Sequence, residues 1–218
     1  MPHAAAPRPD AQKKTLRAEE RGRADVAAER AAYEERVRGL VPDGLVFVDE
    51  AGVTTAMTRR YARAPKGRRA VGAAPCGSWR RLTVLGALGT EGVLAAMTIE
   101  AATSTAVFPA FLDRVLIPEL VRTKPGAVAV MDNLSPHKAA AVRARLEAAG
   151  LGLLYLPRYS PDLSPIEPMW AKLKALLRAQ AARTVAALDK ALGPALDAVT
   201  ARDARGFFRG CGYAVALN

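Results

Sequence analysis

The spacing of apolar residues changes along this chain between two patterns. Short unbroken apolar runs are typical of strands buried on both faces, and apolar residues three or four apart are typical of helices. Strand-like runs cover residues 45–50, 81–89, 92–100, 127–132 and 151–157, with Gly89-Thr90-Glu91-Gly92 as a hairpin turn. Helical spacing covers 103–121, 135–149, 165–182 and 184–209. This order predicts an α/β fold with a mixed central β-sheet flanked by helices.

The same pattern divides the chain into a main domain and flanking segments. Residues 1–12 read as a disordered tail, and residues 13–44 as a charged, exposed helical lead-in that ends near Pro42-Asp43-Gly44. We expect one domain over residues 45–213 and a short tail over 214–218. A chain of 218 residues is long enough for one domain with a full core.

Composition excludes several classes of protein. No stretch reaches 18 apolar residues, and the first residues lack the apolar core of a secretory signal, so we expect no membrane span and a cytoplasmic location. The two cysteines, Cys76 and Cys211, lie too far apart for a CxxC metal site and are too few for a disulfide framework. With only two histidines as well, any metal site must rely on carboxylates, which favours Mg²⁺ or Mn²⁺.

The net charge of +11 is large for a chain of this length, and such an excess predicts a polyanionic partner. Between Ala51 and Thr90 there is no acidic residue. The alternative is a solvated basic loop, but Tyr61 and Trp79 within the segment favour nucleic acid. The basic residues of the segment are Arg59, Arg60, Arg63, Lys66, Arg68, Arg69, Arg80 and Arg81.

Two predicted strands end in an aspartate, Asp49 in FVDE and Asp132 in VMDN. Functional residues gather at the carboxyl ends of parallel strands, so neighbouring strands would bring the two carboxylates together. One aspartate after a strand is usually a turn residue, but two after fully apolar strands indicate a metal site.

Glu167 is the third candidate carboxylate, and it has two interpretations. Ser164-Pro165-Ile166-Glu167 fits a helix capping box, with Ser164 as the cap. Glu167 also shares a helix face with Lys174 and Arg178, which suits a metal at the helix start and DNA alongside. An apolar stripe faces the core from another side of this helix and consists of Ile166, Trp170, Leu173 and Leu177.

Three segments, FVDEAG, VMDNLSPHK and PRYSPDLSPIEPMWAKLK, resemble the DDE transposases of the bacterial IS630 insertion-sequence group, which is related to Tc1/mariner elements. The 34 residues between Asp132 and Glu167 match the separation typical of that superfamily. The resemblance extends from Lys13 to Tyr213. It implies an RNase H-like fold and a transposase catalytic domain that cuts and joins DNA strands.

The resemblance also implies roles for particular residues. Asp49, Asp132 and Glu167 would be the catalytic metal ligands, binding two Mg²⁺ ions that Mn²⁺ can replace. Arg59, Arg60, Arg63, Lys66, Arg68, Arg69, Lys174 and Arg178 would contact DNA backbone phosphates. Asn133, His137 and Lys138 match the family pattern after the second aspartate and would support the ligands, although a turn residue and two polar helix residues explain them equally well.

The implied partners are transposon-end and target DNA, with a TA dinucleotide as target, and a second copy of the chain on DNA in the bacterial nucleoid. Full-length relatives carry helix-turn-helix domains ahead of the catalytic domain, whereas only about 44 residues precede the first predicted strand here. A separate helix-turn-helix polypeptide would then bind the transposon ends. Two alternatives stay open: a truncated transposase that binds DNA without moving it, and another RNase H-like nuclease.

Overall fold

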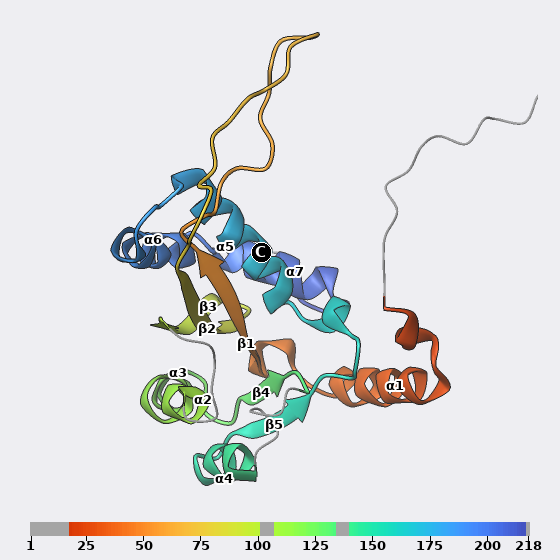
Figure 1. Ribbon diagram of the computed structural model, residues 1–218. Helices are drawn as coiled ribbons and strands as arrows, with labels where there is room; N and C mark the ends of the chain where they lie inside the picture. Colours follow the sequence, from red (N-terminus) through yellow and green to blue (C-terminus); the bar gives the residue numbers. More distant parts are fainter. Residues whose placement is uncertain (1–17, 101–106, 134–139, 217–218) are drawn as a thin grey trace, which may run out of the picture.

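The computed structural model describes residues 18–100, 107–133 and 140–216, which form a five-stranded sheet flanked by helices (Figure 1). The strand order is β3-β2-β1-β4-β5. β1 and β2 are antiparallel, as are β2 and β3, whereas β1, β4 and β5 run parallel. The strands are β1 (Leu45–Thr54), β2 (Arg81–Gly89), β3 (Gly92–Ile99), β4 (Val128–Met131) and β5 (Gly152–Tyr155). The predicted mixed sheet and its hairpin are therefore confirmed.

Helices cover both faces of this sheet, which separates two hydrophobic cores (Figure 1). Along β1, Leu45 and Phe47 enter the core beneath α5, α6 and α7, while Val46 and Val48 enter the core beneath α2, α3 and α4, because successive strand residues face opposite sides. The helices are α1 (Ala24–Arg38), α2 (Val107–Phe111), α3 (Ile117–Thr123), α4 (Ala140–Ala148), α5 (Ile166–Gln180), α6 (Val185–Asp197) and α7 (Ala201–Gly210), with a π-helical turn (Leu112–Leu116) joining α2 to α3.

β1 is longer than its apolar run predicts. The run ends at Glu50, but the strand continues to Thr54 because β2 pairs with it along that whole length. Its parallel pairing with β4 stops earlier, at the pair Val48 and Met131. Asp49 thus lies inside a strand and not at its end, which corrects the prediction, although it is the first β1 residue beyond the parallel pairing.

The lead-in helix α1 packs against the domain, which corrects the prediction that it is exposed. Val26 and Tyr33 are 0% and 5% exposed. The hydroxyl groups of Tyr33 and Tyr213 are hydrogen-bonded at 2.8 Å, which joins α1 to the C-terminal segment. Two buried contacts on an otherwise polar helix were too few to give an amphipathic pattern, so the sequence did not reveal them.

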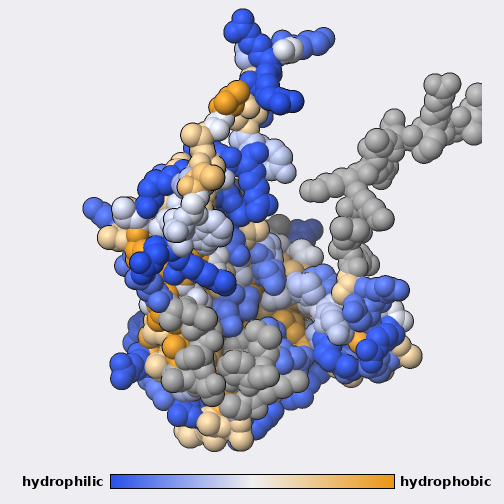
Figure 2. Space-filling view, in the orientation of Figure 1, coloured by the Kyte–Doolittle hydropathy of each residue, from blue (hydrophilic) through white to orange (hydrophobic). Residues whose placement is uncertain are grey.

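The basic segment between β1 and β2, residues 55–80, projects from the body as a long arm (Figure 1). Figure 2 shows that the tip of this arm is mostly hydrophilic. The root is held where the Thr55 N–H donates to the Arg80 carbonyl at 3.1 Å and the Arg183 guanidinium donates to the Met57 carbonyl at 2.8 Å. Charge alone predicted an anion-binding segment, but the projecting shape was not foreseen.

Some expectations fall on parts of the chain outside the described residues. These include the tail over residues 1–12 and the start of the helix expected from Ser135, of which α4 is the described part. No helix within the described ranges has the length and apolarity needed to cross a lipid bilayer.

Candidate active site

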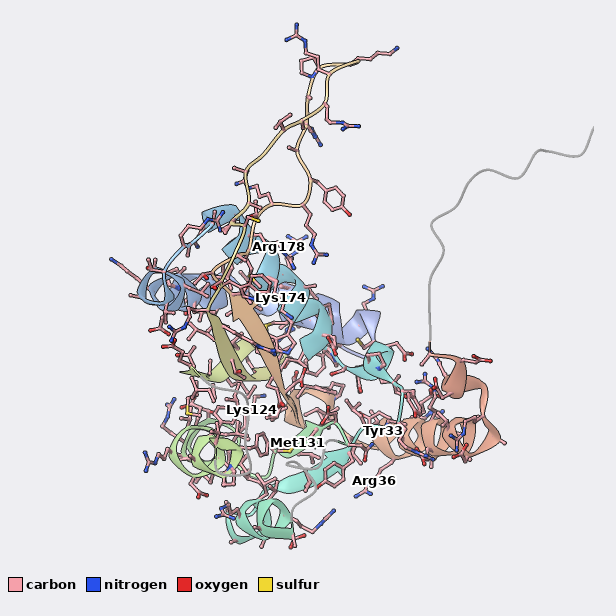
Figure 3. All side chains as sticks on the ribbon, viewed as in Figure 1. Tyr33, Arg36, Lys124, Met131, Lys174 and Arg178 are labelled. Atoms are coloured by element: carbon pink, nitrogen blue, oxygen red, sulfur yellow. The ribbon has the colours of Figure 1, made fainter. Side chains whose placement is uncertain are left out.

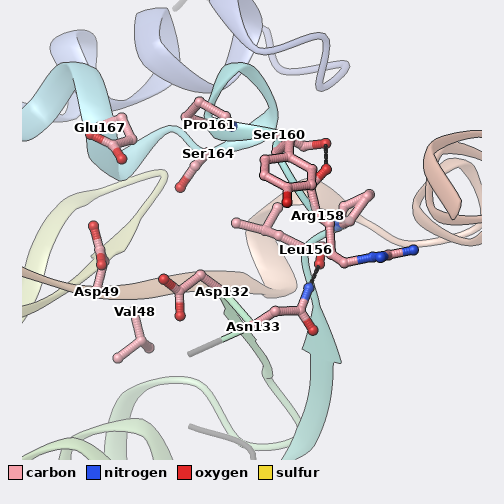
Figure 4. Close-up of a pocket in the computed structure, with 12 residues that line it drawn as sticks. Val48, Asp49, Asp132, Asn133, Leu156, Arg158, Ser160, Pro161, Ser164 and Glu167 are labelled. Carbon is pink, nitrogen blue, oxygen red and sulfur yellow. Dashed lines mark hydrogen bonds between the residues drawn. The ribbon is translucent and has the colours of Figure 1, made fainter. Parts of the chain in front are cut away.

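Asp49 and Asp132 lie next to one another because of the register between β1 and β4. Val48 pairs with Met131 in the last parallel pair, and each is followed directly by one of the two aspartates. Neighbouring strands lie about 4.8 Å apart, so consecutive residues beyond a register pair stay close. Figure 4 shows both side chains beside the same open space.

Glu167 reaches this space from the helical layer above the sheet. It is the second residue of α5, and its side chain is exposed. Asp49, Asp132 and Glu167 all line one pocket of about 520 Å³ (Figure 4). The chain after β5 forms its rim through Leu156, Pro157, Arg158, Tyr159, Ser160, Pro161 and Ser164. The structure therefore brings the three predicted carboxylates to one pocket.

The capping-box interpretation of Glu167 is wrong. No side-chain hydrogen bond caps the start of α5, whose N-cap is Pro165. The Glu167 N–H instead donates to the backbone carbonyl of Ser164 at 3.1 Å. This backbone bond uses the donor that a Ser164 side-chain cap would need, so the Glu167 carboxylate has no reciprocal cap to complete.

Burial dominates the electrostatics of Asp49. It raises the pKa of this carboxyl to about 7, because a charged group loses its hydration inside the protein. Hydrogen bonds from the Glu50 backbone N–H and from Trp170 lower the pKa in part. The negative charges of Glu167 and Asp132 raise it again. Cations placed between these groups would relieve both the desolvation and the repulsion.

Trp170 is a functional candidate that the sequence analysis assigned only to the core. The apolar stripe of α5 is buried as predicted, and Trp170 is 2% exposed. Its indole N–H also donates to Oδ2 of Asp49 at 3.0 Å. A buried tryptophan usually finds a partner for its N–H, and that rule was the one available hint.

The other predicted supporting residues have different outcomes. The Asn133 side-chain amide donates to the Leu156 carbonyl and so ties the end of β4 to the end of β5 (Figure 4). His137 and Lys138 lie outside the described residues. Lys174 and Arg178 lie further along α5 toward the arm, partly exposed (Figure 3).

The six cations between residues 59 and 69 of the arm are exposed and do not line the pocket. None of them forms an ion pair with any residue in the described ranges, which leaves their charges to solvent or to a partner. They are Arg59, Arg60, Arg63, Lys66, Arg68 and Arg69.

The chemistry of the pocket fits hard divalent cations, since its acidic ligands are carboxylates and no described cysteine or histidine lines it. Among the residues that the structure describes, no three acidic, histidine or cysteine side chains converge on a single point that could hold one ion. Asp49 nevertheless interacts electrostatically with both Glu167 and Asp132. The arrangement suits ions held by pairs of carboxylates with Asp49 common to both pairs.

Residues 44–189, more than half of the chain, match the family described as DDE superfamily endonuclease. The chain belongs to this family. A comparison with curated protein sequences finds no match. The pocket between β1, β4 and α5 brings two aspartates and one glutamate together in this family member.

Solved structures of Mos1 transposase share the fold of this DDE family member. The Mos1 paired-end complex with the left transposon end has a TM-score of 0.74 at 20% identity, covering 94% of this chain and 63% of that one. The Mos1 mariner paired-end complex with Mg has a TM-score of 0.70 at 19% identity, covering 94% and 63%. The catalytic domain of Mos1 mariner transposase gives 0.61 at 18% identity, covering 92% and 91%. The RNase H-like fold is thus confirmed, and the chain spans about 63% of the Mos1 chains in the complexes.

Proposed function

We propose that this chain is a transposase catalytic domain that cleaves DNA and transfers the cut strand to a new site, with Asp49, Asp132 and Glu167 as its catalytic residues. The observation that carries the proposal is the convergence of these three carboxylates in one pocket of a DDE endonuclease fold. The Mos1 structures, whose titles name paired transposon ends and Mn or Mg, support DNA and a divalent metal as its partners.

Asp49 would hold both divalent cations, with Asp132 completing one ligand set and Glu167 the other. Divalent cations at such a site stabilise the charge on the attacking and leaving oxygens and help deprotonate the attacking hydroxyl. The half-buried Asp49 side chain is held by the hydrogen bond from Trp170, and the exposed position of Glu167 leaves the pocket open on the side where DNA would enter.

DNA would lie across the open mouth of the pocket and extend along two basic surfaces. One is the face of α5 with Lys174 and Arg178, and the other is the arm with Arg59, Arg60, Arg63, Lys66, Arg68 and Arg69. Lysine and arginine contacts of this kind go to phosphates, so they bind DNA with little dependence on sequence.

The finer parts of the proposal rest on the sequence resemblance. They are membership of the IS630 group in a bacterium, cut-and-paste transposition with a TA target, action as a homodimer on DNA in the cytoplasm, and a separate helix-turn-helix polypeptide for end recognition. A domain boundary near residue 45 is part of the same proposal, with α1 now included in the catalytic unit because it packs on it.

The proposal is tested by conservative removal of each negative charge, with Asp49→Asn, Asp132→Asn and Glu167→Gln. We expect each variant to stay folded and to lose Mg²⁺-dependent DNA nicking by roughly 10³-fold or more, because the metal contributes several kcal/mol to the transition state. Nicking of supercoiled plasmid is the measurement, with circular dichroism as the check on folding.

Two controls make the test specific. Asp197→Asn removes an exposed carboxylate near the end of α6 and should leave nicking unchanged. Ser164→Ala should also stay active, because Ser164 lines the pocket without being a proposed metal ligand and its side chain does not cap α5. Full activity of Glu167→Gln would remove Glu167 from the catalytic set, and a wild type that binds DNA without nicking it would favour the truncated, DNA-binding alternative.

A further inference from the structure

The contact between Trp170 and Asp49 joins the two elements that carry the proposed ligands. Asp49 belongs to β1, while Trp170 lies on α5, three residues after Glu167. The indole N–H donates to Asp49 Oδ2 at 3.0 Å, between residues 121 positions apart in sequence. One side chain therefore spans from the helix that bears Glu167 to the strand that bears Asp49.

The indole ring occupies space that a side chain at position 86 would fill, and Gly86 leaves that space open. Gly86 lies on β2 directly opposite Asp49 in the antiparallel register. A Cβ atom added there would lie 2.7 Å from the Cη2 atom of Trp170, which is closer than real contacts allow. The ring thus lies against bare strand backbone next to Asp49, which lets α5 approach the sheet closely at this point.

We propose that Trp170 is a positioning residue, which holds the Asp49 carboxylate in one orientation and sets the spacing between Asp49 and Glu167 for cation binding. The inference rests on the proposed function of these carboxylates as metal ligands. A carboxylate with one oxygen held by an N–H cannot rotate freely, so its other oxygen keeps a fixed direction. Groups that orient metal ligands in this way typically change metal affinity by about 10–100-fold when removed.

A purely structural role is the competing explanation. A buried tryptophan whose N–H happens to meet a carboxylate would contribute to stability without any effect on metal binding. Both explanations predict a lower melting temperature for Trp170→Phe, so stability does not separate them. Metal affinity of the folded protein does separate them, whereas the state of the indole N–H before metal is added tests the hydrogen bond that the positioning role requires.

The chain offers a matched control, because it has two tryptophans. Trp79 lies in the arm and is 59% exposed, so Trp79→Phe makes the same chemical change away from the pocket. In ¹H–¹⁵N spectra of the metal-free protein, the Trp170 indole N–H should exchange with solvent at least about tenfold more slowly than that of Trp79. Its signal should move in Asp49→Asn and stay in place in Asp197→Asn. An indole N–H of Trp170 that exchanges as fast as that of Trp79 would overturn the proposal without reference to any metal.

The second measurement is Mn²⁺ affinity, followed by the electron paramagnetic resonance signal of unbound Mn²⁺. We expect Trp170→Phe to bind Mn²⁺ about 10–100-fold more weakly than wild type, and Trp79→Phe to bind it with unchanged affinity. Gly86→Ala is a second, independent variant, because it displaces the ring while keeping the indole. It should weaken Mn²⁺ binding in the same direction.

The outcomes distinguish this inference from the proposed function. If wild type and Asp49→Asn bind Mn²⁺ equally, the metal site itself is misassigned, and both proposals fall. If Asp49→Asn loses Mn²⁺ while folded Trp170→Phe keeps wild-type affinity, the metal site stands and the positioning role is overturned. Loss of affinity in both Trp170→Phe and Gly86→Ala, with Trp79→Phe unchanged, supports the inference.

Discussion

At the scale of single residues, the half-buried carboxyl of Asp49 lies where its charged form costs the fold free energy. Burial and the neighbouring charges raise its pKa from 3.8 to about 7. In the unfolded chain the same group ionises near pH 3.8, so between about pH 4 and 7 the folded state binds the extra proton. As far as Asp49 determines it, the free energy of unfolding is therefore highest below about pH 4 and falls as the pH rises to about 7.

This linkage gives a prediction for metal-free protein. Asp49→Asn should be close to wild type in stability at pH 4 and more stable at pH 8, by at most about 4 kcal/mol for three pKa units. The amide keeps the size of the carboxyl but has no charge to desolvate. Urea unfolding at several pH values measures the difference. A gain that is the same at pH 4 and pH 8 would contradict a raised pKa.

At the scale of elements, the sheet and its covering helices were predictable because their apolar periodicities differ. The positions of Asp49 and Asp132 followed from the same reasoning, although β1 outlasts its apolar run. Sequence could not show that Trp170 meets Asp49, since nothing local links residues 121 positions apart. The capping-box prediction was wrong for a different reason. The local sequence pattern is present, but the Glu167 N–H donates to the Ser164 backbone carbonyl and not to the Ser164 side chain.

The arm between β1 and β2 gives a direct prediction about DNA binding. Changing Arg59, Arg60 and Arg63 together to alanine should weaken DNA binding and flatten its salt dependence. Each lost phosphate contact lowers the slope of log K against log salt by about 0.9. Fluorescence anisotropy with a labelled duplex at several salt concentrations is the measurement.

The control for the arm replaces three exposed arginines elsewhere, Arg114, Arg202 and Arg209, and removes the same total charge. If this triple variant lowers the slope as much as the arm variant does, net charge and not the arm determines DNA binding. An unchanged slope in the arm variant would likewise remove the arm from the DNA interface.

At the scale of the whole molecule, α1 is connected to the rim of the pocket. Arg158, which lines the pocket, pairs with Glu29 at 2.6 Å and with Asp25 at 2.7 Å. Arg30 pairs with Asp162 at 3.0 Å, and its side chain is only 12% exposed. These ion pairs connect α1 to the loop after β5, which forms the rim of the pocket. The segment that the sequence indicated to be a lead-in therefore helps to hold the pocket in shape.

Deleting residues 1–40 should therefore destabilise the catalytic domain by about 3–6 kcal/mol, since two buried side chains, Val26 and Tyr33, contribute about 1.5–3 kcal/mol each. Deleting only residues 1–12 is the matched control and should leave stability unchanged. Thermal unfolding followed by circular dichroism compares the two. Equal melting temperatures for both deletions would mean that α1 is dispensable.

The parallel pairing of β1 with β4 also decides when the pocket can exist during synthesis. Leu45 pairs with Val128, 83 positions later, and the pocket needs α5 after that. A ribosome adds roughly 5–20 residues per second, so the first aspartate leaves it several seconds before its partners do. Nascent or terminated chains that end before α5 consequently have no complete pocket. A cell that translates this gene is therefore exposed to the proposed DNA-cutting activity only from polypeptides that extend through α5.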